Sequence, residues 1–176
     1  SGAYADVRLL PAERVLKLPD TVSDRDAAAT LLKGLTAHAL LHRTYRVRKG
    51  DWIVVHAAAG GVGMILVQWA KHLGAKVIGV VGSEAKAEQV RQFGADHVMV
   101  GIDALAARVR GVTKGKGVAV VYDSVGKDTF MASLDSLAPL GLFVSFGNAS
   151  GPVPPFDAGL LAQKGSLFFT RPTLAS

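Results

Sequence analysis

The sequence predicts a doubly wound α/β fold, in which helices cover both faces of a six-stranded parallel sheet. Short β-branched runs alternate regularly with helical stretches from residue 50 onward. These runs are apolar throughout rather than at every second position, which is typical of strands buried on both faces. Repeated strand–helix–strand units of this kind require parallel strands and right-handed crossovers. The length of 176 residues and the 49% hydrophobic content suit one domain with a sizeable core.

Each element follows from its local sequence. Residues 1–22, which include two prolines, are expected to form an extended connector, and residues 23–176 the α/β domain. Ser23 is a suitable N-cap for a helix that should run through residue 45 and be weakened at Gly34. The strands are predicted at 52–57, 76–81, 97–100, 118–122, 142–146 and 166–170. The helices between them are predicted at 61–73, 83–93, 102–112 and 127–138.

The composition excludes several classes of protein. There is no cysteine, so disulfides and thiolate metal ligands are excluded, and a reducing cytoplasm is the expected location. No apolar run reaches the length of a membrane span, and the first ten residues lack the pattern of a signal peptide. The net charge of +6 is compatible with nucleic acid, with a phosphorylated small molecule or with no specific partner.

The clearest chemical signal is a loop rich in glycine and alanine after the first strand. It contains Ala58-x-Gly60-x-x-Gly63, a variant of the dinucleotide fingerprint with alanine at the first glycine. A strand precedes it, a helix follows and a second strand comes next, which is the context that the mechanism requires. Small residues let the backbone approach a pyrophosphate, and the free N–H groups of the new helix point at that anion. A tight turn that only permits close packing is the alternative.

The second strand indicates which dinucleotide binds. Enzymes that use NAD usually place Asp or Glu at its end, where the carboxylate binds the ribose 2′-hydroxyl. Here the strand ends in Gly82 and Ser83, Glu84 comes slightly late, and Lys86 follows. A neutral tip with a nearby lysine suits the extra phosphate of NADPH. Lys86 as an ordinary solvated helix residue is the alternative.

Several further segments make the sequence similar to a known family. LLKGLTAHALLHRTYRVRKGD (31–51) precedes the loop, and YDSVGKDTF (122–130), VSFGNASG (144–151) and QKGSLFFTRPTL (163–174) follow it in order. With them, essentially the whole chain resembles the zinc-independent quinone oxidoreductase branch of the medium-chain dehydrogenase/reductase superfamily, which includes zeta-crystallin. The resemblance implies an enzyme that transfers hydride from NADPH to quinones or other conjugated carbonyls.

The resemblance also implies contacts for individual residues. Thr36 would lie beside the nicotinamide ribose, the main chain of Gly61 and Val62 would contact the pyrophosphate, and Gly82, Ser83 and Lys86 would surround the 2′-phosphate. Ser124 and Asn148 also suit simple turn hydrogen bonds, and Phe169 suits a core position. No catalytic residue is assigned. The other implied cofactor contacts are Ser124, Gly126, Phe146, Gly147, Asn148, Ser150, Phe169 and Thr170.

The sequence departs from the family pattern at three positions. A tyrosine that often reaches the 2′-phosphate is replaced by Gly101, which weakens the argument for NADPH without reversing it. A tyrosine expected near the active site is replaced by Ala39. Leu32 stands where zinc-dependent relatives carry a cysteine ligand, so we expect no zinc site. The resemblance also implies that a β-rich catalytic domain and a C-terminal segment lie outside these 176 residues. We therefore expect this chain alone to bind NADPH weakly and to reduce quinones poorly.

Three other features of the sequence do not indicate a catalytic, metal or nucleic-acid site. His38 and His42 have a spacing that can hold zinc, but the intervening residues lack a metalloprotease glutamate and there is no obvious third ligand. His56 closes the first strand and is expected to be packed rather than catalytic. The basic segments 43–51 and 108–117 have few aromatic residues for base stacking, so we do not expect a nucleic-acid partner.

The leading hypothesis is therefore the NADPH-binding domain of a quinone or enone reductase with a small-molecule substrate. An enoyl-thioester reductase of the same superfamily is an alternative enzyme. A non-catalytic module that senses NADPH or binds RNA, as a crystallin-like protein, is an alternative of another class. The apolar run SLFFT (166–170) is expected at a sheet edge, where exposed strands pair, and the family resemblance implies a homodimer through it.

Overall fold

The computed structural model describes residues 4–174, which divide into two compact units, Ser1–Leu32 and Lys33–Ser176. The first unit holds a 3₁₀ turn, Ala12–Arg14, and the beginning of helix α1 (Asp24–His38). Ser23 caps this helix as predicted: its hydroxyl oxygen accepts a hydrogen bond from the Asp26 amide at 3.1 Å and donates one to the Asp26 carboxylate. Most side chains of this unit are exposed.

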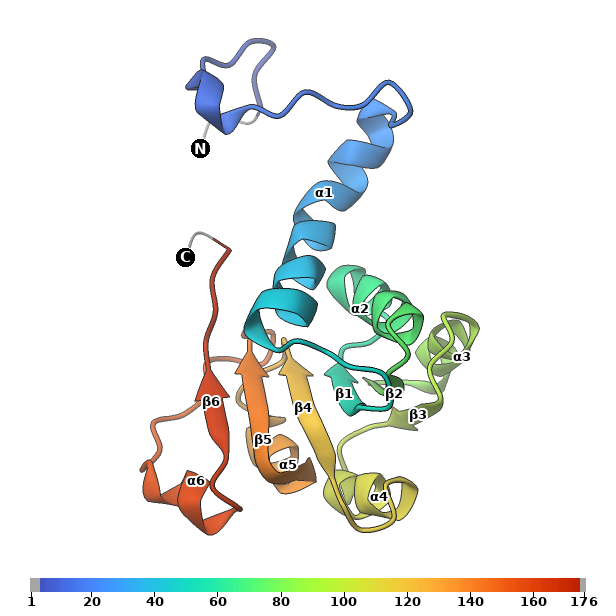
Figure 1. Cartoon of the computed structure of the whole chain (residues 1–176), viewed down its shortest axis with the longest axis vertical. Helices are drawn as coiled ribbons and strands as arrows, with labels where there is room; N and C mark the ends of the chain where they lie inside the picture. The colour runs from blue at the N-terminus through green and yellow to red at the C-terminus, as the bar shows by residue number, and fades with distance from the viewer. Residues whose placement is uncertain (1–3, 175–176) are drawn as a thin grey trace. The chain divides into compact units, whose positions relative to one another are not determined.

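The second unit is built on a parallel sheet of six strands, which confirms the predicted fold class (Figure 1). The spatial order is β3-β2-β1-β4-β5-β6, so the strand order reverses between β1 and β4 and leaves β3 and β6 at the edges. Because all strands are parallel, their carboxyl ends and the loops that follow lie along one edge of the sheet. The strands are β1 (Trp52–His56), β2 (Lys76–Val81), β3 (His97–Val100), β4 (Val118–Asp123), β5 (Leu137–Ser145) and β6 (Phe168–Thr170).

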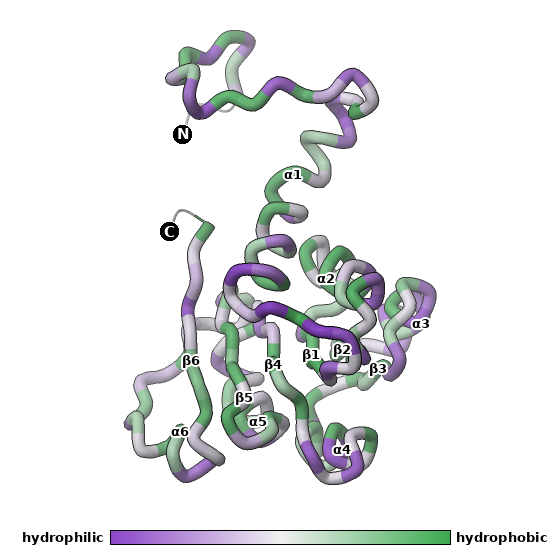
Figure 2. Tube along the Cα trace, in the orientation of Figure 1, coloured by the Kyte–Doolittle hydropathy of each residue, from purple (hydrophilic) through white to green (hydrophobic). Residues whose placement is uncertain are grey.

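Helices cover both faces of this sheet and bury two apolar clusters. One cluster packs under the helices α2 and α3 and centres on β1 and β2, with Ile53, Leu66 and Tyr122 fully buried. The other packs under α4, α5 and α6, with Phe130 and Phe143 at its centre. The hydrophobic colouring of the strands in Figure 2 reflects this burial on both sides. The helices are α2 (Gly61–His72), α3 (Glu84–Gln92), α4 (Leu105–Val112), α5 (Phe130–Ser136) and α6 (Gly159–Gln163).

The structure differs from the predicted elements in three places. Helix α1 passes through Gly34 without a break and changes at Ala39 into a π-helical segment, Ala39–Thr44. The predicted helix 127–138 begins later and stops at Ser136, because Pro139 cannot continue a helix and the residues before it are already extended in β5. The segment between β5 and β6, for which no helix is predicted, contains α6.

A buried carboxylate joins the ends of two central strands. Asp123, the last residue of β4, is fully buried and accepts four hydrogen bonds. Its Oδ1 accepts from the amides of Val125 and Gly126 at 2.7 and 3.0 Å. Its Oδ2 accepts from the hydroxyls of Thr129 and Ser133 at 2.6 and 3.1 Å. This one side chain therefore holds the turn after β4 and the start of α5.

His56, the last residue of β1, completes the network. Its Nε2 lies 2.9 Å from the Ser133 Oγ, whose single proton is directed at Asp123, so Nε2 carries the proton of the neutral ring and donates it to Ser133. Burial lowers the pKa of His56 below its usual value, and the Asp123 carboxylate 3.9 Å away opposes this shift only in part. His56 is packed, as its sequence position predicts.

The lowered pKa of His56 predicts a loss of stability in mild acid. Below the pKa of histidine in the unfolded chain, about 6.5, the unfolded chain binds a proton at His56. The folded chain binds this proton only at a lower pH, because its pKa is lower. The contribution of the neutral His56 ring to the free energy of unfolding should therefore be complete above about pH 6.5. Below that pH the free energy of unfolding should fall by up to about 1.4 kcal/mol per pH unit. Urea unfolding at pH 7.5, 6.5 and 5.5 measures this slope.

The matched variants are His56→Gln and His72→Gln, the second at an exposed position of α2. His56→Gln should lower stability at pH 7.5 and flatten the dependence between pH 6.5 and 5.5, whereas His72→Gln should keep the original slope. Equal slopes in all three proteins would contradict the assignment of the pH dependence to His56.

Candidate functional site

The turn from β1 into α2 is too tight for larger side chains at its centre. Ala57 adopts a left-handed conformation with φ of 46°, and its carbonyl accepts the Gly60 amide at 2.8 Å. A Cβ on Gly63 would lie 2.3 Å from the Ala57 carbonyl oxygen and 2.8 Å from the Ala58 Cα. Only glycine fits there, because the helix packs directly against the turn that precedes it.

The start of α2 presents unpaired backbone donors. The first hydrogen bond of its ladder runs from the Met64 amide to the Gly60 carbonyl at 2.9 Å, so the amides of Gly61, Val62 and Gly63 precede the ladder. The first turn of this helix contains no acidic residue. Free amides and the positive end of the helix dipole make this a favourable place for an anion.

A cavity of about 410 Å³ lies beside this helix start and brings together three predicted site residues, Gly60, Gly82 and Lys86. Within the described residues, Lys86 forms no ion pair. The two acids of α3, Glu84 and Glu88, pair with Arg91 instead. Glu84 is 77% exposed at its side chain and does not line the cavity. The β2 tip therefore offers a cation and no carboxylate to a ligand in this space.

Other residues around this cavity modify that environment. Gly101, at the end of β3, lines it with a φ of +69°, and nothing lies within 4 Å of where its Cβ would be. The missing side chain leaves open space near Lys86. Ser83 precedes α3 outside this lining and makes no capping hydrogen bond with its side chain. The network residues His56 and Thr129 also form part of the wall, together with the exposed Asp128.

The loops after β4 and β5 pack closely against each other. A Cβ on Gly126 would lie 2.3 Å from the Gly151 carbonyl oxygen, and one on Gly147 would lie 2.5 Å from the Ser124 carbonyl oxygen. The Ser150 hydroxyl donates to the Val125 carbonyl at 2.9 Å and accepts from an amide of the facing loop. Asn148 accepts the Gly151 amide with its main chain, so these residues build the loop pair itself.

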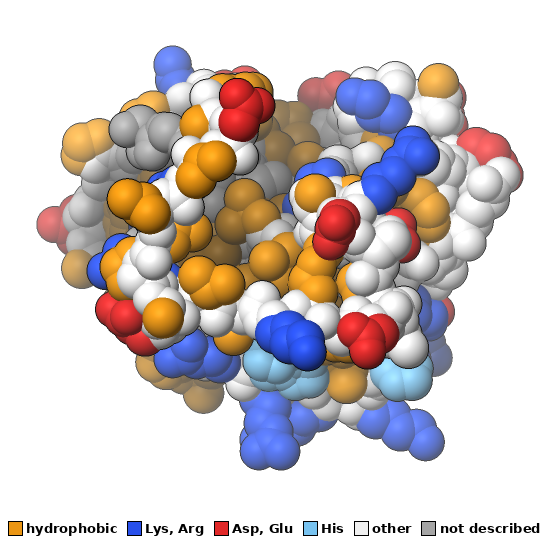
Figure 3. All heavy atoms as spheres, turned by 90° about the horizontal axis from the view of Figure 1, so that it is seen from above, with side chains coloured by type: hydrophobic (Ala, Val, Ile, Leu, Met, Phe, Trp, Pro, Cys, Tyr) orange, Lys and Arg blue, Asp and Glu red, His pale blue; other side chains and the backbone are white. Residues whose placement is uncertain are grey.

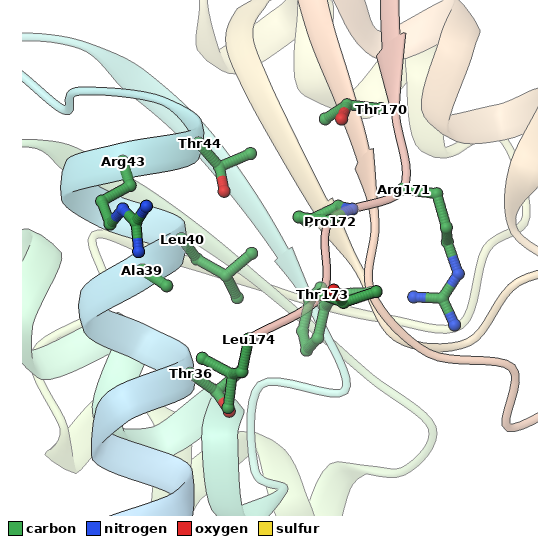
Figure 4. A pocket seen from close by; sticks show the side chains of 11 residues that line it. Thr36, Ala39, Leu40, Arg43, Thr44, Thr170, Arg171, Pro172, Thr173 and Leu174 are labelled. Carbon is green, nitrogen blue, oxygen red and sulfur yellow. The ribbon is translucent and has the colours of Figure 1, made fainter. Parts of the chain in front are cut away.

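A second cavity, of about 790 Å³, lies between the end of α1 and the segment after β6 (Figure 4). Thr36, Phe146 and Thr170, all predicted contacts, line it, and so does Ala39. Phe169 lies outside this lining and stacks on Phe143 with ring centroids 5.4 Å apart, as a core residue would. The structure thus assembles the predicted residues in two neighbourhoods along the carboxyl edge of the sheet rather than in one cluster.

Two arginines of this second cavity were not predicted. Arg43 projects from the helical side, while Arg171 extends away from the helix and donates to the Ser145 carbonyl at 2.9 Å (Figure 4). The signal for Arg43 was present in the sequence, because residues 36, 39, 40 and 43 recur at helical spacing on one face. Arg171 had no such signal, since its place depends on the packing of β6 on β5.

The histidines do not form a metal centre. His38 and His42 stack with centroids 4.8 Å apart, and both rings face Trp69 at 5.6 and 5.4 Å. Within residues 4–174 no three His, Cys, Asp or Glu side chains come together to hold a metal ion. Figure 3 shows Lys and Arg side chains interspersed with acidic, apolar and uncharged ones.

Comparison with known proteins places this site in a family. The profile of the family described as "Zinc-binding dehydrogenase" matches residues 61–171. A quinone oxidoreductase of Pseudomonas aeruginosa is 53% identical over 99% of this chain and 54% of its own length. The crystal structure of a Pseudomonas syringae quinone oxidoreductase, 53% identical, superposes with a TM-score of 0.91 over 94% of this chain and 51% of that chain.

An Escherichia coli quinone oxidoreductase complexed with NADPH is 51% identical, with a TM-score of 0.85, over 89% of this chain and 48% of that one. The chain therefore spans about half the length of the relatives it matches. Within its described residues, no helix is both long and apolar enough to cross a membrane. The matched profile covers more than half of the sequence and includes helix α2, the β2 tip and the loops after β4 and β5, so the chain belongs to the zinc-binding dehydrogenase family and is similar within it to the quinone oxidoreductases.

Proposed function

We propose that the chain is the NADPH-binding part of an oxidoreductase that reduces quinones or other conjugated carbonyls. One observation carries the proposal: the cavity beside α2 joins a helix start free of acids to a β2 tip with Lys86 and no carboxylate. Such a site suits two separate phosphate groups, and it lacks the carboxylate that binds the ribose 2′-hydroxyl in NAD-dependent enzymes. The similarity to a relative complexed with NADPH supports the same cofactor here.

The residues of the chain fit this cofactor in an extended pose along the carboxyl edge of the sheet. In the proposed arrangement, the pyrophosphate lies at the start of α2, the 2′-phosphate lies near Lys86, and the nicotinamide lies in the cavity beside Thr36. The proposed cofactor contacts are Thr36, Gly60, Gly61, Val62, Gly63, Gly82, Ser83, Lys86, Ser124, Gly126, Phe146, Gly147, Asn148, Ser150, Phe169 and Thr170.

The chemistry of the proposed reaction is divided between cofactor and protein. NADPH supplies a hydride when it is bound, and the chain binds and orients it. The cavity of about 790 Å³ is large enough for a nicotinamide ring and a small conjugated substrate to lie in contact. Its threonine hydroxyls offer hydrogen bonds without introducing negative charge.

The family description implies zinc, but the residues of this chain do not fit a zinc centre. We propose a zinc-independent enzyme, because cysteine is absent from the sequence and Leu32 stands where the ligand of zinc-dependent relatives is expected. The absence of cysteine also supports our proposal of a cytoplasmic location.

We propose in addition that the protein forms a homodimer through β6. This strand lies at the sheet edge, and its first residue, Phe168, is 59% exposed although it is large and apolar. An exposed edge with unpaired backbone groups favours pairing with a second copy, which would also cover the phenyl ring.

Lys86→Ala tests the NADPH site. Removing a charged hydrogen bond to the 2′-phosphate should weaken NADPH binding about tenfold while leaving NADH binding unchanged. Calorimetric titration of both nucleotides into the wild type and the variant measures the ratio of affinities. Lys116→Ala, in the loop before β4 and therefore at the opposite edge of the sheet, removes the same charge as a control. An unchanged NADPH/NADH ratio in Lys86→Ala would remove this lysine from the phosphate site.

Phe168→Asp tests the proposed dimer. A carboxylate buried in a paired edge should separate the copies. Light scattering at micromolar concentration should therefore report about twice the mass of 18.4 kDa for the wild type and a single mass for the variant. Met131→Asp, at a half-exposed apolar residue of α5, should keep the wild-type mass. A monomeric wild type, or a dimer that tolerates Phe168→Asp, would exclude this interface.

A further inference from the structure

The side chain of Lys33 lies across the first residue of α2. Its Cε and Cδ are 2.8 and 2.9 Å from the position that a Cβ on Gly61 would occupy, and its ammonium nitrogen is 3.4 Å from it. The absence of a side chain at Gly61 leaves the space in which this lysine stem packs. The exposed side chain of Lys33 thereby brings a cation of α1 close to the free amides that begin α2.

This placement is electrostatically unfavourable in the free protein. The amino-terminal end of a helix carries partial positive charge and favours acids, while lysines are favourable at the opposite end. Helices α1 and α3 follow this rule with Asp24, Asp26 and Glu84 in their first turns, whereas α2, like α4, α5 and α6, has no acid there. None of the ion pairs in the described part of the chain includes Lys33. The ammonium group of Lys33 and the positive end of the α2 dipole are therefore close together, and no acidic side chain of the described ion pairs lies between them.

We infer that Lys33 binds the bridging phosphates of the dinucleotide and closes the pyrophosphate site from the side opposite the α2 amides. The inference rests on the proposed function and names a residue that the glycine loop alone does not reveal. An anion bound between them would be attracted both to the ammonium group and to the start of the helix, and it would relieve the repulsion between the two. The lysine thus has a physical reason to lie where a helix would otherwise exclude it.

Lys33 and Lys86 have separable roles. The bridging phosphates occur in both NADPH and NADH, whereas the 2′-phosphate occurs only in NADPH. Lys33 therefore contributes to the affinity for any dinucleotide, and Lys86 contributes to the choice between the two. Loss of one charged hydrogen bond predicts a decrease of about tenfold in affinity in each case.

The chain contains a matched control at the other end of the same helix. The Cγ of Lys49 lies 2.9 Å from where a Cβ on Gly74 would be, just after α2 ends. Both lysines thus pack their stems on a glycine, but Lys49 lies at the negative end of the helix, where a cation is favourable in the free protein.

The test compares Lys33→Gln and Lys49→Gln in the full 176-residue chain. Lys33→Gln should weaken NADPH and NADH binding by the same factor of about ten and leave the affinity for adenosine 2′-monophosphate unchanged. It should also raise the melting temperature of the free protein by about 2 °C, because a repulsive charge has been removed. Lys49→Gln should leave nucleotide affinity unchanged and lower the melting temperature.

Inorganic pyrophosphate separates this inference from the proposed function. It should raise the melting temperature of the wild type and of Lys49→Gln, and raise that of Lys33→Gln less. If pyrophosphate shows this dependence while the wild type binds no NADPH, the role of Lys33 stands and the proposed function fails. If the wild type binds NADPH and Lys33→Gln binds both dinucleotides equally well, or loses only NADPH, the inference is overturned.

Discussion

The rest of the site depends on the carboxylate of Asp123. The strand order reverses between β1 and β4, so the loops after these two strands leave the sheet in opposite directions and open a crevice. Asp123 spans that crevice through Ser133 to His56 and holds the turn at Gly126 with its other oxygen. Three of the four hydrogen bonds that it accepts are buried, so they are shielded from competition by water.

The local arrangement of charges around the cavity explains its suitability for an anion better than the net charge of the chain does. The formal net charge of the sequence is +6. What matters for an anionic ligand is that two elements contribute no acid to the cavity, although Asp128 lines it from the loop after β4. The first turn of α2 has none, and at the β2 tip Glu84 faces Arg91 instead. In the proposed site, selectivity for phosphate would result as much from where carboxylates are missing as from where lysines lie.

Local patterns predicted most of the fold, and the reasons for the failures are non-local. The strands at 76–81 and 97–100 and the start of α2 follow from short apolar runs and a glycine turn, and the structure has them at those residues. The contact between His56 and Ser133 joins positions 77 residues apart, and no sequence period predicts it. The stem of Lys33 on Gly61 likewise requires two elements to meet, so Lys33 looked like any exposed lysine.

The π-helical segment that follows α1 constrains the length of the chain at this point. Its widened turn is visible in the hydrogen bond from the Tyr45 amide to the Leu40 carbonyl, five residues earlier. A π turn is a helix with one residue inserted, so deleting a residue between 39 and 44 would restore a regular helix. Because the widened turn absorbs its extra residue locally, the side chains within the segment would be redistributed around the helix axis. These include Arg43 in the cavity wall and the buried Leu40 and Leu41. Natural variation in length should therefore be tolerated in the loops around this segment and excluded within it.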